Sequence, residues 1–128
     1  MNYNMNIKLG KFDFLQIPRV VWSDKTLSPL AKLLYIGMFD RMKISRVKGW
    51  YDENLDVYIY YTIEGICDLL GVGEKKAQQI KKELRDKNLI KEVRQGLNRP
   101  NKIYVQAFES VYSNQEIINA TDDENIVF

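Results

Sequence analysis

Four polar side chains with two kinds of chemistry lie close together just past the middle of the sequence. In "EKKAQQ", Lys75 and Lys76 carry cations, and Gln78 and Gln79 carry side-chain amides. Lysine ammonium groups can neutralise phosphates or donate to guanine O6 and N7, while a glutamine amide can pair with N6 and N7 of adenine. A helix that needed only solubility would more often have glutamate at the two glutamine positions. The segment therefore has the chemistry to bind a polyanion and to distinguish bases.

Helical periodicity predicts which side of this segment faces outward. From residue 74 to residue 86, Ala77, Ile80 and Leu84 are spaced three and four residues apart and form a narrow apolar stripe. At about 100° per residue, the lysines and glutamines fall on the outward side of such a helix. The predicted contact set of this helix is Lys75, Lys76, Gln78, Gln79 and Lys82.

A second basic cluster follows the helix on a predicted β-hairpin. The segments "LIKEVRQ" and "KIYVQAF" are rich in β-branched and aromatic residues, and "GLNRPN" between them consists mostly of turn residues. No acidic residue lies between Arg94 and Lys102. Cationic side chains on a hairpin tip suit contact with phosphates or entry into a minor groove. The predicted contact set of the hairpin is Arg94, Asn98, Arg99, Asn101 and Lys102.

Two further helices are predicted ahead of the basic one. Ser28 can cap a long core helix with Pro29 in its first turn, where the missing N–H costs nothing. The expected inward positions of this helix are Leu30, Leu33, Leu34, Gly37, Met38 and Met42. Thr62 can cap a shorter helix that ends at Gly71, and the free N–H groups at its start could add a phosphate contact. The expected inward positions of the shorter helix are Ile63, Ile66, Leu69 and Leu70.

The other segments predict extended structure. "GWYDENLDVYIYYT" predicts two strands joined by a polar turn. In "FDFLQIPRVVW", the aromatic and β-branched content favours an edge strand or an extended arm, because Pro18 argues against a central strand. An exposed edge strand invites pairing with a second copy of the chain, which makes this segment the candidate dimer arm. The arm residues are Phe14, Leu15, Ile17, Val20, Val21 and Trp22.

These elements predict an α+β fold: a winged helix-turn-helix with an N-terminal extended arm, an extra β-hairpin and a C-terminal wing. A short helix, a tight turn and a second helix form a helix-turn-helix, whose second helix can enter the major groove of DNA. We predict that this domain spans residues 1–106. Residues 107–128 have five acidic and no basic side chains and are predicted to be an acidic tail that begins a linker.

The composition argues against several other classes of function. The chain has 128 residues, of which 45% are hydrophobic, enough for one domain with one core. It has no histidine, and its single cysteine, Cys67, is expected to be a small packing residue, so we predict no catalytic site, no metal and no cofactor. The apolar runs are too short to span a membrane and no signal-peptide core is evident, which favours a cytoplasmic protein. Residues 73–106 contain ten basic and four acidic side chains, which favours double-stranded DNA as the partner.

Four stretches of the sequence resemble the N-terminal domain of the RepA-N plasmid replication initiators of low-GC Gram-positive bacteria. They are "FLQIP" (14–18), "LSPLAKLLYIGMFDRM" (27–42), "GWYDENLDVYIYYTIEGICDLLG" (49–71) and "GLNRPNKIYV" (96–105). The resemblance implies a winged-helix domain that binds repeated sites in a plasmid origin as a homodimer. It also implies a further C-terminal domain that engages host replication proteins, with residues 107–128 as the start of the interdomain linker.

Two other functions remain open at the level of the sequence. A winged-helix transcription regulator would use the same basic face. A winged helix used for protein–protein interaction would dock its basic helix on an acidic partner, and its binding to random duplex DNA would lack a steep salt dependence.

Overall fold

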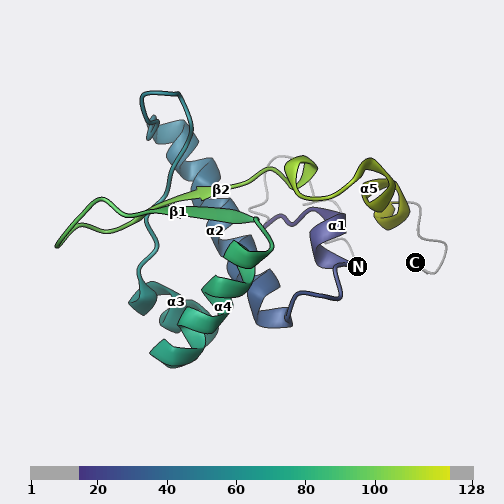
Figure 1. The fold of residues 1–128 in the computed structure, drawn as a ribbon, viewed down its shortest axis with the longest axis horizontal. Coiled ribbons are helices and arrows are strands. Elements are labelled where there is room, and N and C mark those ends of the chain that lie inside the picture. Colours follow the sequence, from purple (N-terminus) through teal and green to yellow (C-terminus); the bar gives the residue numbers. More distant parts are fainter. Residues whose placement is uncertain (1–14, 122–128) are drawn as a thin grey trace, which may run out of the picture.

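A computed structural model of the chain describes residues 15–121 (Figure 1). Helices surround a small two-stranded antiparallel sheet, so the predicted α+β class is confirmed. The elements in chain order are α1 (Arg19–Trp22), α2 (Pro29–Lys48), α3 (Ile63–Leu70), α4 (Glu74–Asp86), β1 (Ile90–Val93), β2 (Lys102–Val105), the 3-10 helix η2 (Phe108–Ser110) and α5 (Asn114–Thr121).

The long helix α2 forms the centre of the domain. It begins as predicted, with the Ser28 hydroxyl accepting from the Ala31 N–H at 3.2 Å, and it packs against α3, α4 and β2. Leu34, Tyr35 and Met38 are fully buried. The expected burial of Leu33 is wrong, because its side chain is 47% exposed and lies beside the buried face instead of on it.

The short helix α3 begins and ends where the sequence predicts. The Thr62 hydroxyl accepts from the Gly65 N–H at 2.9 Å, and Gly71 ends the helix with a left-handed φ of 66°. Leu69 is 46% exposed, against expectation. Its side chain lies next to Gly37 of α2. A Cβ at Gly37 would lie only 2.9 Å from Leu69 Cδ2, so the glycine allows the two helices to approach closely.

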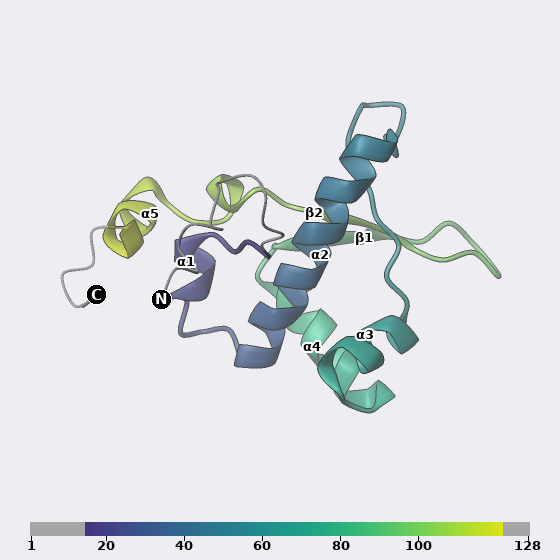
Figure 2. The ribbon, with the colours of Figure 1, turned by 180° about the vertical axis from the view of Figure 1, so that it is seen from behind.

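The helix α4 and the β1–β2 hairpin follow as predicted. Ala77, Ile80 and Leu84 are buried against α2 and α3, which confirms the apolar stripe. The hairpin pairs Ile90 with Val105 and continues in register to Val93 and Lys102, so its strands are shorter than the predicted segments. Figures 1 and 2 show α3, α4 and the hairpin tip together toward one end of the molecule, with α1 and α5 toward the other.

The predicted N-terminal arm is wrong for residues 19–22, which form α1. The carbonyl of Pro18 accepts from the N–H groups of Val21 and Trp22, so the proline starts a helical turn. Val20 and Val21 are buried in the core and are not available for pairing with a second copy. Leu15 and Trp22 are exposed, Ile17 packs partly against the core, and Phe14 lies outside the described residues.

The predicted extra β-hairpin is reduced to isolated bridges. Tyr51 forms a single antiparallel bridge with Val57, around a turn in which the Asp52 carboxylate accepts from the N–H groups of Asn54 and Asp56. Ile59 instead bridges to Ile103 on β2. The second predicted strand therefore leaves its partner after one residue, because its buried isoleucine adds to the edge of the β1–β2 sheet.

The segment after β2 is folded onto the domain over its described part. Helix α5 packs against α1, and Tyr112 and Ala120 belong to the hydrophobic core. The Tyr112 O–H donates to the Asp24 carboxylate at 2.8 Å, across 88 positions of the sequence. Residues 107–121 therefore supply apolar side chains that cover α1.

The pH dependence of unfolding tests this attachment. Burial would raise the pKa of Asp24, but hydrogen bonds from Thr26, Tyr112 and Lys87 outweigh it and lower the pKa from 3.8 to about 2. A lowered folded-state pKa means that the charged Asp24 stabilises the fold above about pH 4 and that this stabilisation is lost as the pH falls toward 2. Tyr112→Phe should lower the free energy of unfolding at pH 7 by about 1–2 kcal/mol and make its fall from pH 5 to pH 3 shallower than in the parent, as measured by urea denaturation.

A matched control is Tyr51→Phe, which removes an exposed hydroxyl that donates to the carbonyl of Arg46. We expect it to change the free energy of unfolding by less than about 0.5 kcal/mol, with the pH profile of the parent. An unaltered pH profile in Tyr112→Phe would contradict the link between the C-terminal segment and Asp24.

Candidate nucleic-acid interface

The predicted contact set of α4 lies on the outward side of the helix. All five side chains are exposed, opposite the buried stripe that holds the helix to the core: Lys75, Lys76, Gln78, Gln79 and Lys82. Gly73 caps the helix through its backbone alone, with no side-chain hydrogen bond. The cations and amides of the first two turns therefore share one accessible surface, and their contact with DNA stays a prediction.

Lys82 differs from the other members because it has an acidic neighbour. Its Nζ lies 2.6 Å from Oδ2 of Asp86, one turn further along α4, and both side chains are exposed. An exposed pair of this kind contributes little to stability, so a phosphate can compete for the lysine. Contact by Lys82 would still require the loss of this pair. Lys75 and Lys76, which make no ion pair within residues 15–121, are therefore the stronger candidates.

The predicted contact set of the hairpin divides into two groups. Arg94, Asn98 and Arg99 are exposed on the loop between the strands, where Asn98 adopts a left-handed φ of 62° that asparagine tolerates. Asn101 and Lys102 are half-buried and engaged within the protein. Asn101 Nδ2 donates to Glu92 at 3.1 Å, and Lys102 Nζ lies 4.5 Å from the centre of the Tyr58 ring.

A buried ionic cluster joins α4 to the hairpin. The Glu92 carboxylate on β1 accepts from Lys81 at 2.8 Å, from Arg85 at 3.0 Å and from Asn101 at 3.1 Å. The side chains of Lys81 and Glu92 are each only 9% exposed. Burial would raise the pKa of Glu92, but the three donors outweigh it and lower the pKa below its usual 4.5. The carboxylate is therefore charged at neutral pH, and both of its oxygens accept hydrogen bonds.

This cluster was not among the predicted features, although the sequence contains a signal for it. Lys81 lies four residues after Ala77 and three before Leu84, so it falls on the buried side of α4. A lysine at such a position needs a partner, because an unpaired buried charge is very costly. The lysine doublets 75–76 and 81–82 look alike in sequence, but only the first is wholly exposed.

A second carboxylate attaches α4 to the central helix. Glu83 accepts from the Ser28 N–H at 3.0 Å and from its hydroxyl at 2.7 Å. The charge lies at the N-terminus of α2, where the helix dipole favours an anion. Glu83 and Glu92 therefore hold α4 from two directions, Glu83 toward α2 and Glu92 toward the hairpin.

Several cations of the basic segment already have an acidic partner within the protein. Four of its ten basic side chains are paired: Lys81, Lys82, Arg85 and Lys87. Six make no ion pair with any residue that the structure describes: Lys75, Lys76, Lys91, Arg94, Arg99 and Lys102. They come from the first turn of α4 and from the hairpin, whose tip projects away from the domain on the side of α3 in Figure 1. Within this basic segment, the unpaired positive charge thus lies at the start of α4 and on the hairpin.

Thr62 lies close to this surface. It is exposed at the start of α3, and its hydroxyl oxygen accepts from the Gly65 N–H. Together with Arg99 and Asn101 it lines a small cavity of about 230 Å³ between α3, α4 and the hairpin loop. The predicted phosphate contact at Thr62 and the predicted hairpin contact at Arg99 therefore face the same space.

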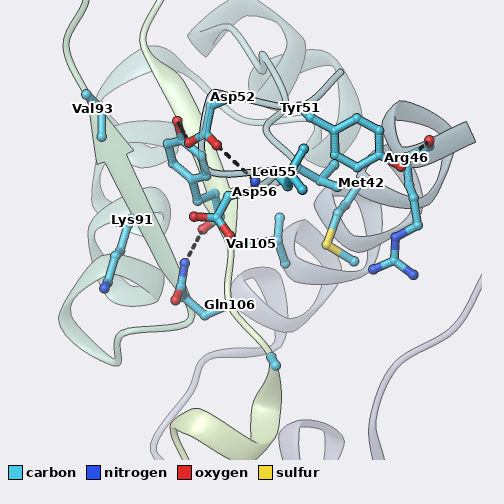
Figure 3. A pocket seen from close by; sticks show the side chains of 13 residues that line it. Met42, Arg46, Tyr51, Asp52, Leu55, Asp56, Lys91, Val93, Val105 and Gln106 are labelled. Atoms are coloured by element: carbon cyan, nitrogen blue, oxygen red, sulfur yellow. Dashed lines mark hydrogen bonds between the residues drawn. The ribbon is translucent and has the colours of Figure 1, made fainter. Parts of the chain in front are cut away.

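A larger groove of about 640 Å³ lies on the other side of the hairpin (Figure 3). It separates the C-terminal half of α2 and the turn at residues 51–57 from the sheet, and it contains charges of both signs, including Arg46, Asp56 and Lys91. Burial and the hydrogen bond to Asp52 raise the pKa of Tyr104 in its wall to about 12. The groove contains none of the side chains that the sequence predicts to make contact.

Two findings concern other kinds of site. Within residues 15–121 there is no group of three or more histidine, cysteine or acidic side chains placed to hold a metal ion. In the same part of the chain, none of the helices combines the length and the apolar character needed to cross a membrane.

Comparison with known proteins shows the family. The model of the family described as "Replication initiator protein A (RepA) N-terminus" matches residues 13–119, most of the chain. The chain belongs to this family. A curated relative, the "41 kDa protein" of Lactobacillus helveticus, is 37% identical over 71 residues, which are 56% of this chain and 20% of that protein. The chain thus spans about a fifth of this relative's length.

Several solved structures are similar over nearly the whole chain. The "N-Terminal domain of DNA binding protein" has a TM-score of 0.74 at 28% identity and covers all of this chain and 96% of its own. The "Structure of Rep-DNA complex" has the same score and identity and covers all of this chain and 97% of its own. The "Structure of MDR initiator" has a TM-score of 0.70 at 28% identity and covers 98% of each chain.

The ionic cluster leads to a prediction about stability. Lys81→Met leaves the Glu92 carboxylate with two donors in place of three and should lower the free energy of unfolding at pH 7 by about 1.5–3 kcal/mol, the range for hydrogen bonds to charged groups. Because the folded-state pKa of Glu92 is lowered, this stabilisation is present above about pH 4.5 and is lost as the pH falls below it. The difference between parent and variant, measured by urea denaturation, should therefore narrow toward about pH 3.

The neighbouring lysine provides the control. Lys82→Met removes an exposed pair on the same helix and should cost less than about 0.5 kcal/mol. Equal losses in the two variants, or a difference for Lys81→Met that does not change with pH, would show that the buried pair does not act as described.

Proposed function

We propose that this chain is a winged helix-turn-helix domain that binds double-stranded DNA at repeated sites of a plasmid replication origin. The observation that carries the proposal is the shared surface of α4 and the hairpin loop. Lys75 and Lys76 on α4, and Arg94 and Arg99 on the loop, are exposed cations without an ion pair among the described residues, and Gln78 and Gln79 are exposed on the same helix as the lysines. Charge provides affinity for the phosphate backbone, and the amides provide the means to distinguish bases.

The elements of the proposed motif have the order and connections that it requires. Helix α3, the turn at residues 71–73 and helix α4 form the helix-turn-helix, with α4 as the recognition helix in the major groove. The β1–β2 hairpin is the wing, whose arginines contact the flanking backbone or the minor groove. The exposed start of α3 at Thr62 contributes a backbone contact from the first helix of the motif.

Membership of the family and the related structures support this proposal. The family is described by its role in replication initiation, and one structure of the same fold, 28% identical to this chain, is titled as a complex with DNA. The repeated sites, the homodimer and the contact of a C-terminal domain with host replication proteins follow from the family resemblance. Such a function places the protein in the bacterial cytoplasm and involves neither catalysis nor a cofactor.

The first prediction from this proposal concerns base recognition. Gln79→Ala should weaken binding to the duplex selected from a randomised pool by about 1–3 kcal/mol and relax the preference at one base position, because the amide is lost from the outward face of α4. The measurement is fluorescence anisotropy with the selected duplex and its single-base variants. Gln115→Ala on α5 removes an exposed glutamine far from the proposed surface and should bind like the parent.

Substitution of Gln78 and Gln79 by glutamate tests whether this surface contacts DNA at all. If glutamate replaces Gln78 and Gln79 without loss of affinity or of base preference, then this part of α4 is only a solvated surface. The proposed placement of the recognition helix would then be wrong.

The second prediction concerns the phosphate backbone. Arg99→Ala should weaken binding to selected and unrelated duplexes alike and should flatten the plot of log K against log salt by about 0.9, the slope for one phosphate contact. Lys25→Ala is the charge-matched control, since it removes an exposed cation from the loop between α1 and α2. It should leave the slope unaltered. If the parent itself bound random duplex without a steep salt dependence, the alternative of a protein-interaction module would be favoured.

A replication assay separates an initiator from a transcription regulator, which would use the same surface. The full-length protein is footprinted on its own coding region and on the DNA upstream of it. Protection of tandem repeats that also support replication of a linked circle would favour the initiator. Protection of a promoter site that does not support replication would favour the regulator.

A further inference from the structure

Both strands attach the β1–β2 hairpin to the rest of the protein: β2 holds it to the core, where Ile103 and Val105 are buried and Ile103 pairs with Ile59, and β1 adjoins α4. The backbone connects them directly through Leu89, whose N–H donates to the carbonyl of Leu84 at 2.9 Å. Beyond this connection, only two of the four β1 residues have side chains directed into the protein: Ile90, which is buried, and Glu92, which binds α4. Lys91 and Val93 are exposed on the other side of the strand. Among the residues that the structure describes, the side-chain hydrogen bonds between the hairpin and α4 all go to Glu92, so this carboxylate is the polar contact that relates the two elements.

We propose that Glu92 is a positioning residue for DNA binding, which holds the hairpin against α4 so that both reach the same duplex. It acts through Lys81 and Arg85 on α4 and through Asn101 at the far side of the hairpin loop. This inference rests on the proposed DNA-binding function, and Glu92 itself touches no DNA in it.

The geometry explains why one carboxylate can have this effect. Lys81 and Arg85 lie one turn apart on α4, so their two bonds to Glu92 fix the strand along the helix as well as toward it. The bond from Asn101 crosses the base of the loop that carries Arg94, Asn98 and Arg99. The position of the loop cations is thereby tied to the same carboxylate that is tied to α4.

The choice of residue types supports a role in orientation over one in stability. Replacing a buried ion pair by apolar side chains is often neutral or stabilising, so packing alone does not require Lys81 and Glu92. Hydrogen bonds between charged groups are directional, whereas apolar contacts permit sliding. A lysine that is 9% exposed is also unable to serve as a phosphate contact itself. What the pair provides is a defined direction between two elements that must act together.

The test compares two carboxylates that attach α4 to different neighbours. Glu92→Gln weakens the attachment to the hairpin, while Glu83→Gln weakens the attachment to α2 and serves as the matched control. Both variants are first checked by circular dichroism and urea denaturation. Affinity for a labelled mixed-sequence duplex and for the duplex selected by the parent is then measured over a range of salt concentrations.

We expect Glu92→Gln to bind the selected duplex about tenfold more weakly, with a salt slope shallower by about one to two, as when one or two phosphate contacts are lost. Glu83→Gln should lose stability but keep the parent's salt slope. Arg99→Ala should also have a smaller effect in the Glu92→Gln background than in the parent, because a misplaced loop has little contact left to lose. If Glu92 had a purely structural role, folded Glu92→Gln protein would keep the parent's salt slope and the parent's full response to Arg99→Ala.

A second variant keeps the inference testable if Glu92→Gln does not fold. Replacing Lys81 and Glu92 together by methionine removes both charges of the buried pair, so neither charge is left buried without its partner. The double variant should fold and show the same shallow salt slope. If folded variants retain the parent's slope and full sensitivity to Arg99→Ala, the positioning role is overturned while the DNA-binding proposal stands. If the parent binds neither duplex, the proposed function fails, and the positioning role fails with it.

Discussion

The fold depends on the burial of one narrow side of α4. Ala77, Ile80 and Leu84 hold the helix against α2 and α3, and most of its other side chains are exposed. Three apolar side chains of this size bury modest area, so the helix needs further attachment if it is to present a defined surface. Carboxylates provide it: Glu83 on α4 reaches the N-terminus of α2, and Glu92 on the hairpin reaches α4. The outward side can then be devoted to polar chemistry without loss of the fold.

The basic side chains of residues 73–106 fall into two groups, those with an acidic partner and those without one among the described residues. Cations near the buried side or the C-terminal end of α4 are neutralised by acids from other elements, as Lys81 is by Glu92 and Lys87 by Asp24. Cations at the start of α4 and on the loop have no such acid within the described residues. Electrostatic attraction to a polyanion acts through charge that is not already compensated. The proposed contact with DNA uses this uncompensated charge of the segment.

Local signals in the sequence predicted much of this arrangement, and long-range contacts decided the remainder. Caps at Ser28 and Thr62 and the stripe of α4 depend on residues within a turn or two, so helix positions followed from spacing alone. The segment at residues 19–22 has the composition of an edge strand, yet it is helical because Tyr112 and α5 cover it from far along the chain. Likewise Ile59 joins β2 at Ile103, a partner that no local pattern could indicate.

The two lysine doublets of α4 show how little charge in a sequence says about binding by itself. Both are Lys-Lys, and they lie six residues apart on one helix. The second doublet begins on the buried side, so Lys81 turns inward to Glu92 and Lys82 pairs with Asp86. The first lies where the stripe has just begun and no acid reaches it from the described residues. Position relative to the buried side, more than the count of lysines, thus decides which doublet is free for a phosphate, and it also decides which one can set the angle of the hairpin.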